Sequence, residues 1–306
     1  MTTRLAARLF CTALALAAGC GRDDDAAAPD GAPTEGDGGE SDGAPSTGEC
    51  PASSFPDDAC TGPVSGDLPL YDGSQEFRTD GEVIENVEIH TEDGLYVPAS
   101  NVTFRNVKIV YTGALDGTFT MVNLNYNSGT VFEDCELDGQ SKVARAISGS
   151  SVTVRNCEIH GVGNAIEAEG PLVVEENYIH DIETADGTDW HADGIQTPAG
   201  DDSVTIVHNT IILTGPETGA INVGSDADDP AADVLVERNL LAGGGYTMYT
   251  AEQGSNYQVL DNHFSTAIYP KVGYYNIWYW GSGEDAGVSK SGNVIHETGA
   301  AADDNL

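Results

Sequence analysis

Between about residue 82 and residue 295 the chain repeats one short pattern, with apolar residues at its first, third and eighth positions and a polar residue at its fifth. Two clear copies are Val102–Ile109 and Val152–Ile159, which read VTFRNVKI and VTVRNCEI. One copy alone cannot bury its apolar side, whereas stacked copies form a continuous core. The repeat therefore constrains the fold more than any other feature of the sequence.

Each copy alternates as a β-strand does, which directs Val102 and Phe104 inward and Thr103 and Arg105 outward. The last apolar residues of successive copies are 20 to 32 residues apart. The short spacings fit one coil of a right-handed parallel β-helix, and the longer ones indicate loops inserted into a coil. We therefore predict an all-β fold, a single-stranded right-handed parallel β-helix. The last apolar residues are Ile89, Ile109, Leu137, Ile159, Ile179, Ile211, Leu241, Phe264 and Ile295.

The position two residues before the last apolar residue tests this alignment. In five copies it is asparagine, namely Asn177, Asn209, Asn239, Asn262 and Asn293. Stacked asparagines would form a hydrogen-bonded ladder at a tight turn, and asparagine tolerates a left-handed backbone there. Cys135 and Cys157 occupy the same position in adjacent copies, so their side chains should lie about 4.8 Å apart. Stacked thiols and a disulfide are both compatible with that spacing.

The N-terminal segment is unlike the repeats. Residues 1–19 combine Arg4 and Arg8 with an apolar run too short to span a membrane, as in an export signal. Leu16–Cys20 resembles a bacterial lipoprotein box, which makes Cys20 the expected lipidation site; plain secretion is the alternative. Residues 20–49 have no aromatic residue and are expected to be a disordered acidic linker.

The folded domain is expected to span residues 50–306. Cys50 and Cys60 at its start should form a small disulfide loop in an exported protein. The chain has 12 Lys and Arg against 50 Asp and Glu, a net charge of −38. This charge argues against a nucleic acid partner, because phosphate binding needs clustered cations. It favours solubility, and some carboxylates could hold Ca²⁺. We expect a monomer that contacts a membrane only through its lipid anchor.

A second strand follows in each coil, with a central apolar residue expected in the core and its neighbours expected to face solvent. The outward positions stack into one strip that is polar and acidic in its N-terminal half and aromatic in its C-terminal half. Such a strip suits sugar rings, which have apolar faces and hydroxyl rims; alternatively, the aromatic residues cap the end of the β-helix. The predicted substrate-binding residues are Arg145, Glu167, Gln196, Asn222, Tyr246, Tyr249, Tyr275 and Trp278.

His191, Asp193 and Lys271 are the candidate catalytic residues. An imidazole can move a proton near neutral pH, although His191 could equally make a structural hydrogen bond. Asp193 could orient His191, cap a turn, or bind a metal ion together with Asp186 and Asp189. Lys271 is either a solvated ion-pair partner or a group that binds a carboxylate or takes part in catalysis. Three other histidines follow strand ends and are expected on another face: His90, His160 and His180.

The blocks His191–Gln196, Leu241–Tyr249 and Tyr269–Tyr275 resemble segments of secreted bacterial proteins in the pectate-lyase-like superfamily of right-handed parallel β-helices. The resemblance covers about residues 63–300. It implies action on polysaccharides, often acidic ones, in which Ca²⁺ or a cation neutralises a uronate carboxylate while a base removes the C5 proton. His191 or Lys271 would then be the base, and Asp189 and Asp193 the Ca²⁺ ligands. An arginine base of the pectate-lyase type is absent from any recognisable motif.

Three functions therefore compete. The first is a cell-surface polysaccharide lyase or a related C5-epimerase that acts on a uronate-containing glycan. The second is a glycoside hydrolase that uses two carboxyl groups, Asp193 and Glu167. The third is a non-catalytic glycan-binding or structural surface module. Superfamily membership alone does not choose among them.

Overall fold

The structure is a computed structural model, and it describes the folded part of the chain without several loops. The described residues are 50–64, 66–125, 127–182, 191–197, 202–216, 218–224, 231–250, 255–279 and 287–306. They form 22 β-strands and, within these ranges, no α-helix. Accordingly, the described residues contain no helix long and apolar enough to cross a membrane. The predicted lipidation site Cys20 and the boundaries at residues 19 and 49 lie outside them.

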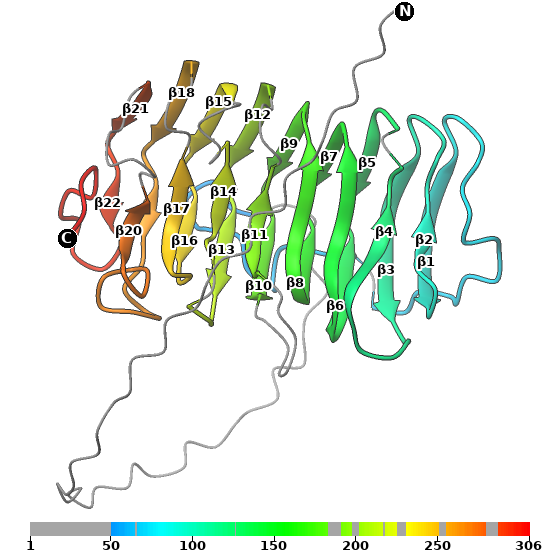
Figure 1. Cartoon of the computed structure of the whole chain (residues 1–306). Helices are drawn as coiled ribbons and strands as arrows, with labels where there is room; N and C mark the ends of the chain where they lie inside the picture. The colour runs from blue at the N-terminus through cyan, green and yellow to red at the C-terminus, as the bar shows by residue number, and fades with distance from the viewer. Residues whose placement is uncertain are drawn as a thin grey trace, which may run out of the picture. The chain divides into compact units, whose positions relative to one another are not determined.

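The strands coil into three parallel ladders that form the faces of a β-helix (Figure 1). Ladder A contains β1 (Val83–Thr91), β3 (Thr103–Tyr111), β5 (Thr130–Glu133), β7 (Val152–Arg155), β9 (Leu172–Glu175), β12 (Asp202–Val207), β15 (Ala232–Glu237), β18 (Ser255–Leu260) and β21 (Val288–Ser291).

Ladder B follows a tight turn. It contains the second halves of β1 and β3 and then β6 (Glu136–Ser150), β8 (Glu158–Glu169), β10 (Tyr178–Ile182), β13 (Thr210–Leu213), β16 (Leu240–Ala242), β19 (His263–Phe264) and β22 (Val294–Ile295). Ladder C contains β2 (Leu95–Tyr96), β4 (Asp116–Asn123), the second halves of β6 and β8, β11 (Asp193–Gln196), β14 (Ile221–Val223), β17 (Tyr246–Thr250) and β20 (Asn276–Tyr279).

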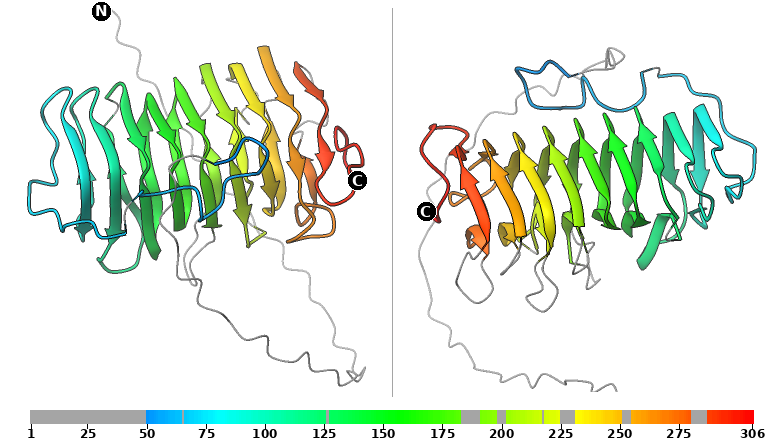
Figure 2. Two further views of the ribbon diagram at one scale, coloured as in Figure 1. Left: turned by 180° about the vertical axis from the view of Figure 1, so that it is seen from behind. Right: turned by 90° about the horizontal axis from the view of Figure 1, so that it is seen from above.

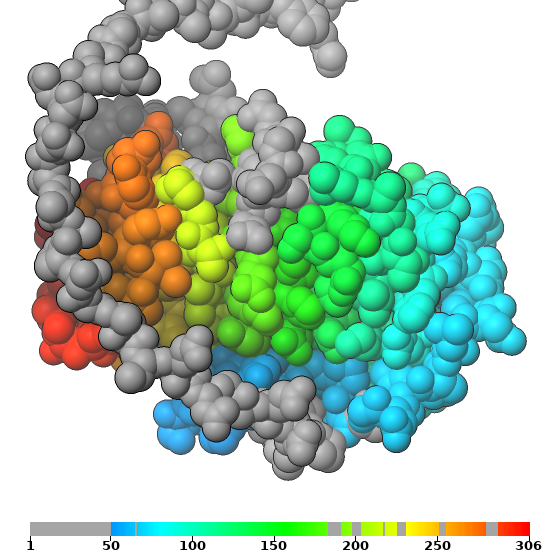
Figure 3. All heavy atoms as spheres, turned by 90° about the horizontal axis from the view of Figure 1, so that it is seen from below, coloured from blue at the N-terminus to red at the C-terminus, as the bar shows by residue number. Residues whose placement is uncertain are grey.

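The predicted alignment of the repeats is confirmed. The column that begins at Ile89 pairs residue by residue through every coil to Ile295, despite inserted loops of different length. All of its members are buried in one hydrophobic core. Successive coils lie side by side in chain order, as the adjacent bands of colour in Figure 3 show. Apolar stacking along one axis therefore supplies the core.

The asparagine ladder is also confirmed. The Nδ2 of Asn177 donates to the Oδ1 of Asn209 at 2.8 Å, and the same bond recurs at 2.9, 2.9 and 3.0 Å along the column to Asn293. Asn293 in turn donates to the carboxylate of Asp303 at 2.8 Å. Each ladder residue is buried, so these bonds satisfy amide groups that water cannot reach.

One detail of that prediction is wrong. The left-handed backbone belongs to the residue before each ladder asparagine, not to the asparagine itself. Glu176, His208 and Arg238 have φ of 60°, 53° and 54° at this turn. Their side chains leave the turn outward, whereas the ladder asparagines point into it, where they can also bond interior carbonyl groups such as that of Val174. The asparagines therefore occupy the buried position from which their amides can bond one another. The residue before each asparagine makes the backbone turn.

Cys135 and Cys157 are both free thiols in the core. The backbone N–H of Cys135 contacts the Sγ of Cys157 at 3.4 Å, so the two residues stack as neighbours without a covalent bond. Burial raises the pKa of the Cys157 thiol well above its ordinary value. Both thiols therefore behave as small apolar side chains that extend the column below the asparagines.

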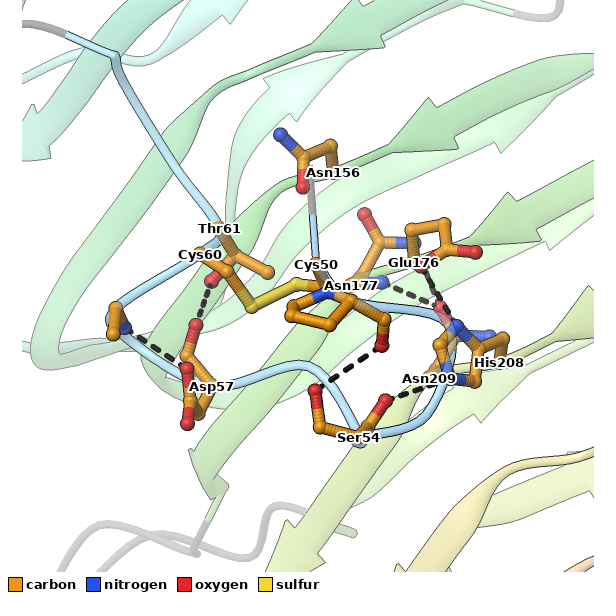
Figure 4. Close-up of a disulfide and its surroundings, with 12 residues drawn as sticks. Cys50, Ser54, Asp57, Cys60, Thr61, Asn156, Glu176, Asn177, His208 and Asn209 are labelled. Carbon is orange, nitrogen blue, oxygen red and sulfur yellow. Dashed lines mark hydrogen bonds and ion pairs between the residues drawn. A yellow bond between two sulfur atoms is a disulfide. The ribbon is translucent and has the colours of Figure 1, made fainter. Parts of the chain in front are cut away.

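Residues 50–64 form a strap that lies across the turns between ladders A and B (Figure 2). The structure joins Cys50 and Cys60 by a disulfide, with their Cα atoms 4.9 Å apart. The His208 imidazole donates to the carbonyl of Ser54 at 2.9 Å and contacts Glu176 at 2.7 Å (Figure 4). At its other end the strap bonds the Asn156 carbonyl and the Asn106 side chain. From Ser54 to Val64 the strap therefore runs opposite to the direction in which the coils advance.

The ladder predicts a large stability loss on truncation of one member. Asn209→Ala leaves the N–H and amide of Asn177 without their acceptor and removes the three bonds that the Asn209 amide donates. We expect the free energy of unfolding to fall by about 3 kcal/mol, since each unpaired buried polar group costs about 1–3 kcal/mol. Equilibrium urea unfolding measures it. The exposed Asn123→Ala is the control, and equal losses in both variants would contradict the structural role of the ladder.

Candidate functional site

A hollow of about 310 Å³ opens on the outer surface of ladder C. It lies where β4, β6, β8 and β11 stack, so consecutive coils each contribute one or two side chains. Its volume lies within the range of small-ligand sites in proteins. The residues that line it are Gly117, Ala144, Arg145, Asn164, Glu167, His191 and Gln196. The structure therefore brings together Arg145, Glu167, His191 and Gln196 of the predicted set.

The polar groups of the hollow hold one another in place. The Arg145 guanidinium pairs with the Glu167 carboxylate from the next coil. The Asn164 amide donates to Glu167 at 3.0 Å and to the Gln196 side-chain oxygen at 2.8 Å. Asn164 therefore links its own coil to the next one, and Glu167 extends the contacts to Arg145 in the preceding coil. The Arg145 and Glu167 side chains are still a third and a quarter exposed, so both can reach a ligand.

His191 lies just before β11, is exposed, and contributes to the wall of the hollow. Its position follows from Asp193, whose backbone N–H donates to the Asn164 side-chain oxygen at 3.0 Å and so fixes the start of the strand. An exposed imidazole beside a guanidinium and a carboxylate can accept a proton from a bound ligand.

Asp193 does not lie on the exposed strip, and that expectation is wrong. Its side chain is fully buried behind the hollow, because the next coils cover it. One carboxylate oxygen accepts the Gly219 N–H at 3.2 Å, while Oδ2 has no hydrogen-bond partner among the described residues. Burial raises the pKa of Asp193 to about 7, and the nearby charge of Glu167 adds to the rise. The Asp193 carboxyl group therefore titrates near neutral pH.

Four tyrosines continue the outer surface of ladder C toward the C-terminal end. The ring centroid of Tyr246 lies 5.4 Å from those of Tyr275 and Tyr279, and Tyr249 lies 4.8 Å from Tyr279. Tyr275 is more than half exposed. Burial, followed by the charge of Asp193, raises the pKa of Tyr249 to about 12. We call Tyr246, Tyr249, Tyr275 and Tyr279 the tyrosine platform.

Trp278 is not part of this platform, and the expectation that it faces solvent is wrong. Trp278, not Ile277, pairs with Met248, so the predicted register of the last coil is off by one residue. Its ring is buried against Phe264 and its Nε1 donates to the Ala302 carbonyl at 3.0 Å. It caps the core, which is the alternative considered for these aromatic residues. Tyr279, which pairs with Tyr249, takes the exposed position instead.

Other sequence-predicted residues do not meet in the hollow. Lys271 is exposed in the loop between β19 and β20 and does not line it. Asn222 is buried on β14, so it is not an exposed contact. The residues that directly precede the central apolar position, such as Gly194 and Ala220, are buried too. A Cβ on Gly194 would meet the Ile211 side chain at 2.4 Å, which shows that this position faces the interior.

The predicted Ca²⁺ ligands can be tested only in part, because Asp186 and Asp189 lie outside the described residues. Calcium takes six to eight oxygen ligands and favours ionised carboxylates. Asp193 supplies one buried carboxyl group with a pKa of about 7, which does not fit a calcium site by itself. The same burial separates Asp193 from a substrate that Glu167 could contact, so the two do not form an exposed pair.

Comparison with known proteins identifies the family. Residues 72–211 and 120–295 match the family model described as the right handed beta helix region. The matched residues make up most of the chain, so the protein belongs to the right-handed β-helix family, and the predicted fold class is confirmed. A place in the pectate-lyase-like superfamily is consistent with this. No curated protein and no solved structure matches the chain.

Burial of Asp193 predicts a particular pH dependence of stability. Because the folded pKa of about 7 lies above the unfolded value of 3.8, the folded state holds the proton longer and stability falls as pH rises from about 4 to 7. Asp193→Asn removes this loss, so the variant should gain up to about 4 kcal/mol on wild type between pH 4 and pH 8. Urea unfolding at both pH values measures it.

The exposed Asp304→Asn removes the same unit charge and controls for the net charge of the protein. Parallel pH profiles for wild type and Asp193→Asn would show that this carboxyl group does not titrate near neutrality.

Proposed function

We propose that this protein acts on a uronate-containing polysaccharide as a lyase or a C5-epimerase. The observation that carries the proposal is the hollow on ladder C, in which Arg145 and His191 lie together on one rigid surface. A guanidinium suits a carboxylate because it offers two parallel donors, and an imidazole suits proton abstraction near neutral pH. The tyrosine platform on the same face supplies surfaces for further sugar rings.

In the proposed reaction, Arg145 binds the uronate carboxylate and spreads the charge that develops at C5. His191 removes the C5 proton. The electron pair left at C5 forms a C4–C5 double bond, while the C4–O bond breaks and the leaving oxygen takes up a proton. In the epimerase variant, C5 instead receives a proton on the opposite face. Gln196, whose side chain is partly exposed, would hydrogen-bond a ring hydroxyl group.

To bind the substrate carboxylate, Arg145 must release its ion pair with Glu167. The partial exposure of that ion pair is consistent with such an exchange. An ion pair with partial solvent exposure is weak, so a second carboxylate can compete for the guanidinium. The net charge of −38 opposes the approach of a polyuronate. Salt should therefore speed association by screening this repulsion. In this proposal the protein is exported and anchored through Cys20 at the bacterial surface.

A panel of uronate polysaccharides tests the proposal. A lyase product absorbs ultraviolet light through its new double bond, whereas epimerisation appears as deuterium uptake at C5 in heavy water. We expect His191→Ala to lower kcat/KM by about 10²- to 10⁴-fold, the usual contribution of a general base. His90→Ala on ladder B is the matched control. An EDTA arm tests the calcium prediction. Absence of both signals on every uronate substrate would refute the proposal, and new reducing ends without absorbance would indicate a hydrolase.

A non-catalytic glycan-binding module is the second candidate, and the tyrosine platform favours it. Tyr275 and Tyr279 expose ring surface on which a sugar ring could stack. In affinity electrophoresis, Tyr275→Ala should weaken glycan retention about 5- to 30-fold, the effect of losing roughly 1–2 kcal/mol of ring contact. Tyr71→Ala, beside the first coil and so at the other end of the β-helix from the platform, is the control. Retention that survives His191→Ala in a protein without turnover would favour this candidate.

A further inference from the structure

A second cluster of chemically capable side chains lies on a different face from the hollow. Glu136, Asp138 and His160 project from ladder B, where Asp138 pairs with His160 across β6 and β8. These strands lie next to each other in Figure 1. One ligand atom from each of the three side chains lies within 4.8 Å of the other two. The sequence pattern predicts His160 on a different face from the substrate strip, and ladder B is that face.

The three side chains are held rather than freely mobile. The His160 Nε2 lies 3.3 Å from Glu136 and its Nδ1 lies 3.7 Å from Asp138. The backbone N–H of Gln140 donates to the Asp138 carboxylate at 2.9 Å, at a bulge that follows the strand. Each of the three side chains is a fifth exposed or less. The ring of His180 stacks on His160 with centroids 5.1 Å apart and fixes its orientation.

We propose that Glu136, Asp138 and His160 bind a divalent transition metal ion of the zinc type. One imidazole nitrogen and two carboxylate oxygens are ligands that Zn²⁺ accepts, with a fourth position left for water. The imidazole favours such an ion over Ca²⁺ or Mg²⁺, which prefer oxygen ligands alone. Neighbouring groups already hold the three side chains in place, so metal binding would cost less side-chain conformational entropy. The proposal does not depend on the chemistry at the hollow.

The groups around the cluster distinguish a metal site from a network of ion pairs. His180, like His160, contacts two carboxylates through opposite ring nitrogens; its partners are Glu158 and Asp181, each at 3.0 Å. Among the described residues, only the cluster of Glu136, Asp138 and His160 brings three such ligand atoms together. Lys108 donates to Glu136 at 2.8 Å and so competes with a metal ion for that oxygen. Removal of Lys108 should therefore strengthen metal binding, which a network of ion pairs alone would not explain.

Isothermal titration of the metal-free full chain with ZnCl₂ tests the proposal, with CaCl₂ titrated in parallel. We expect one zinc ion per chain and a rise in the unfolding temperature on zinc addition. His160→Ala should weaken zinc binding by about 100-fold or more, because a ligand matters more than its supporting contacts. Lys108→Met should tighten it by about three- to tenfold. His90→Ala, which removes a histidine paired with a single carboxylate at 2.5 Å, should leave it unchanged.

Absence of zinc binding to the wild-type chain would overturn the proposal, as would equal loss of binding in His160→Ala and His90→Ala. Equal affinities for zinc and calcium would also overturn it, because the imidazole would then contribute nothing. Lys108→Met guards against a folding defect in His160→Ala, since it predicts a gain rather than a loss. Activity on uronate glycans plays no part in these readouts, so failure here leaves the proposed function untouched.

Discussion

The structure depends on one constraint, namely that the backbone of each coil pairs with the same residues of the coils above and below it. In parallel pairing without a register shift, equivalent side chains stack directly on one another. The pairing holds from Ile89 to Ile295 along ladder B, so one buried column runs the length of the domain. Inserted loops leave the column intact because they lie between the strands. The hollow and the cluster of Glu136, Asp138 and His160 are both consequences, since each collects side chains from successive coils.

Much of the fold follows from the sequence because the apolar pattern is local and repeats. The repeat pattern alone aligns the nine apolar residues of ladder B and the five asparagines. The slip at Trp278 has a physical origin. Ile277 is more apolar than Trp278, yet the end of the core needs a large side chain that the C-terminal segment can cover, and the indole supplies it. Patterns within one coil do not show what lies beyond the last coil.

The candidate site was harder to predict than the fold. Stacking the outward positions groups Arg145, Glu167 and Gln196, and His191 precedes the strand of Gln196; the hollow contains all four. Burial of Asp193 could not be anticipated, because its cover comes from Gly219 and other residues of later coils. Lys271 follows an insertion of irregular length, and the stacking rule does not apply within such a segment. Strand positions are therefore predictable here, whereas the placement of loops is not.

The ladder of asparagines has a direction. Every side-chain amide donates toward the C-terminal end of the domain, so the carbonyl dipoles of the column are aligned and add together. A row of aligned dipoles leaves partial positive charge at its donating end, as a helix does at its N-terminus. Asp303 meets that end with a carboxylate, which accepts a hydrogen bond and cannot pass one on. The domain thus carries an electrically polarised axis whose positive pole is neutralised by a single acidic side chain.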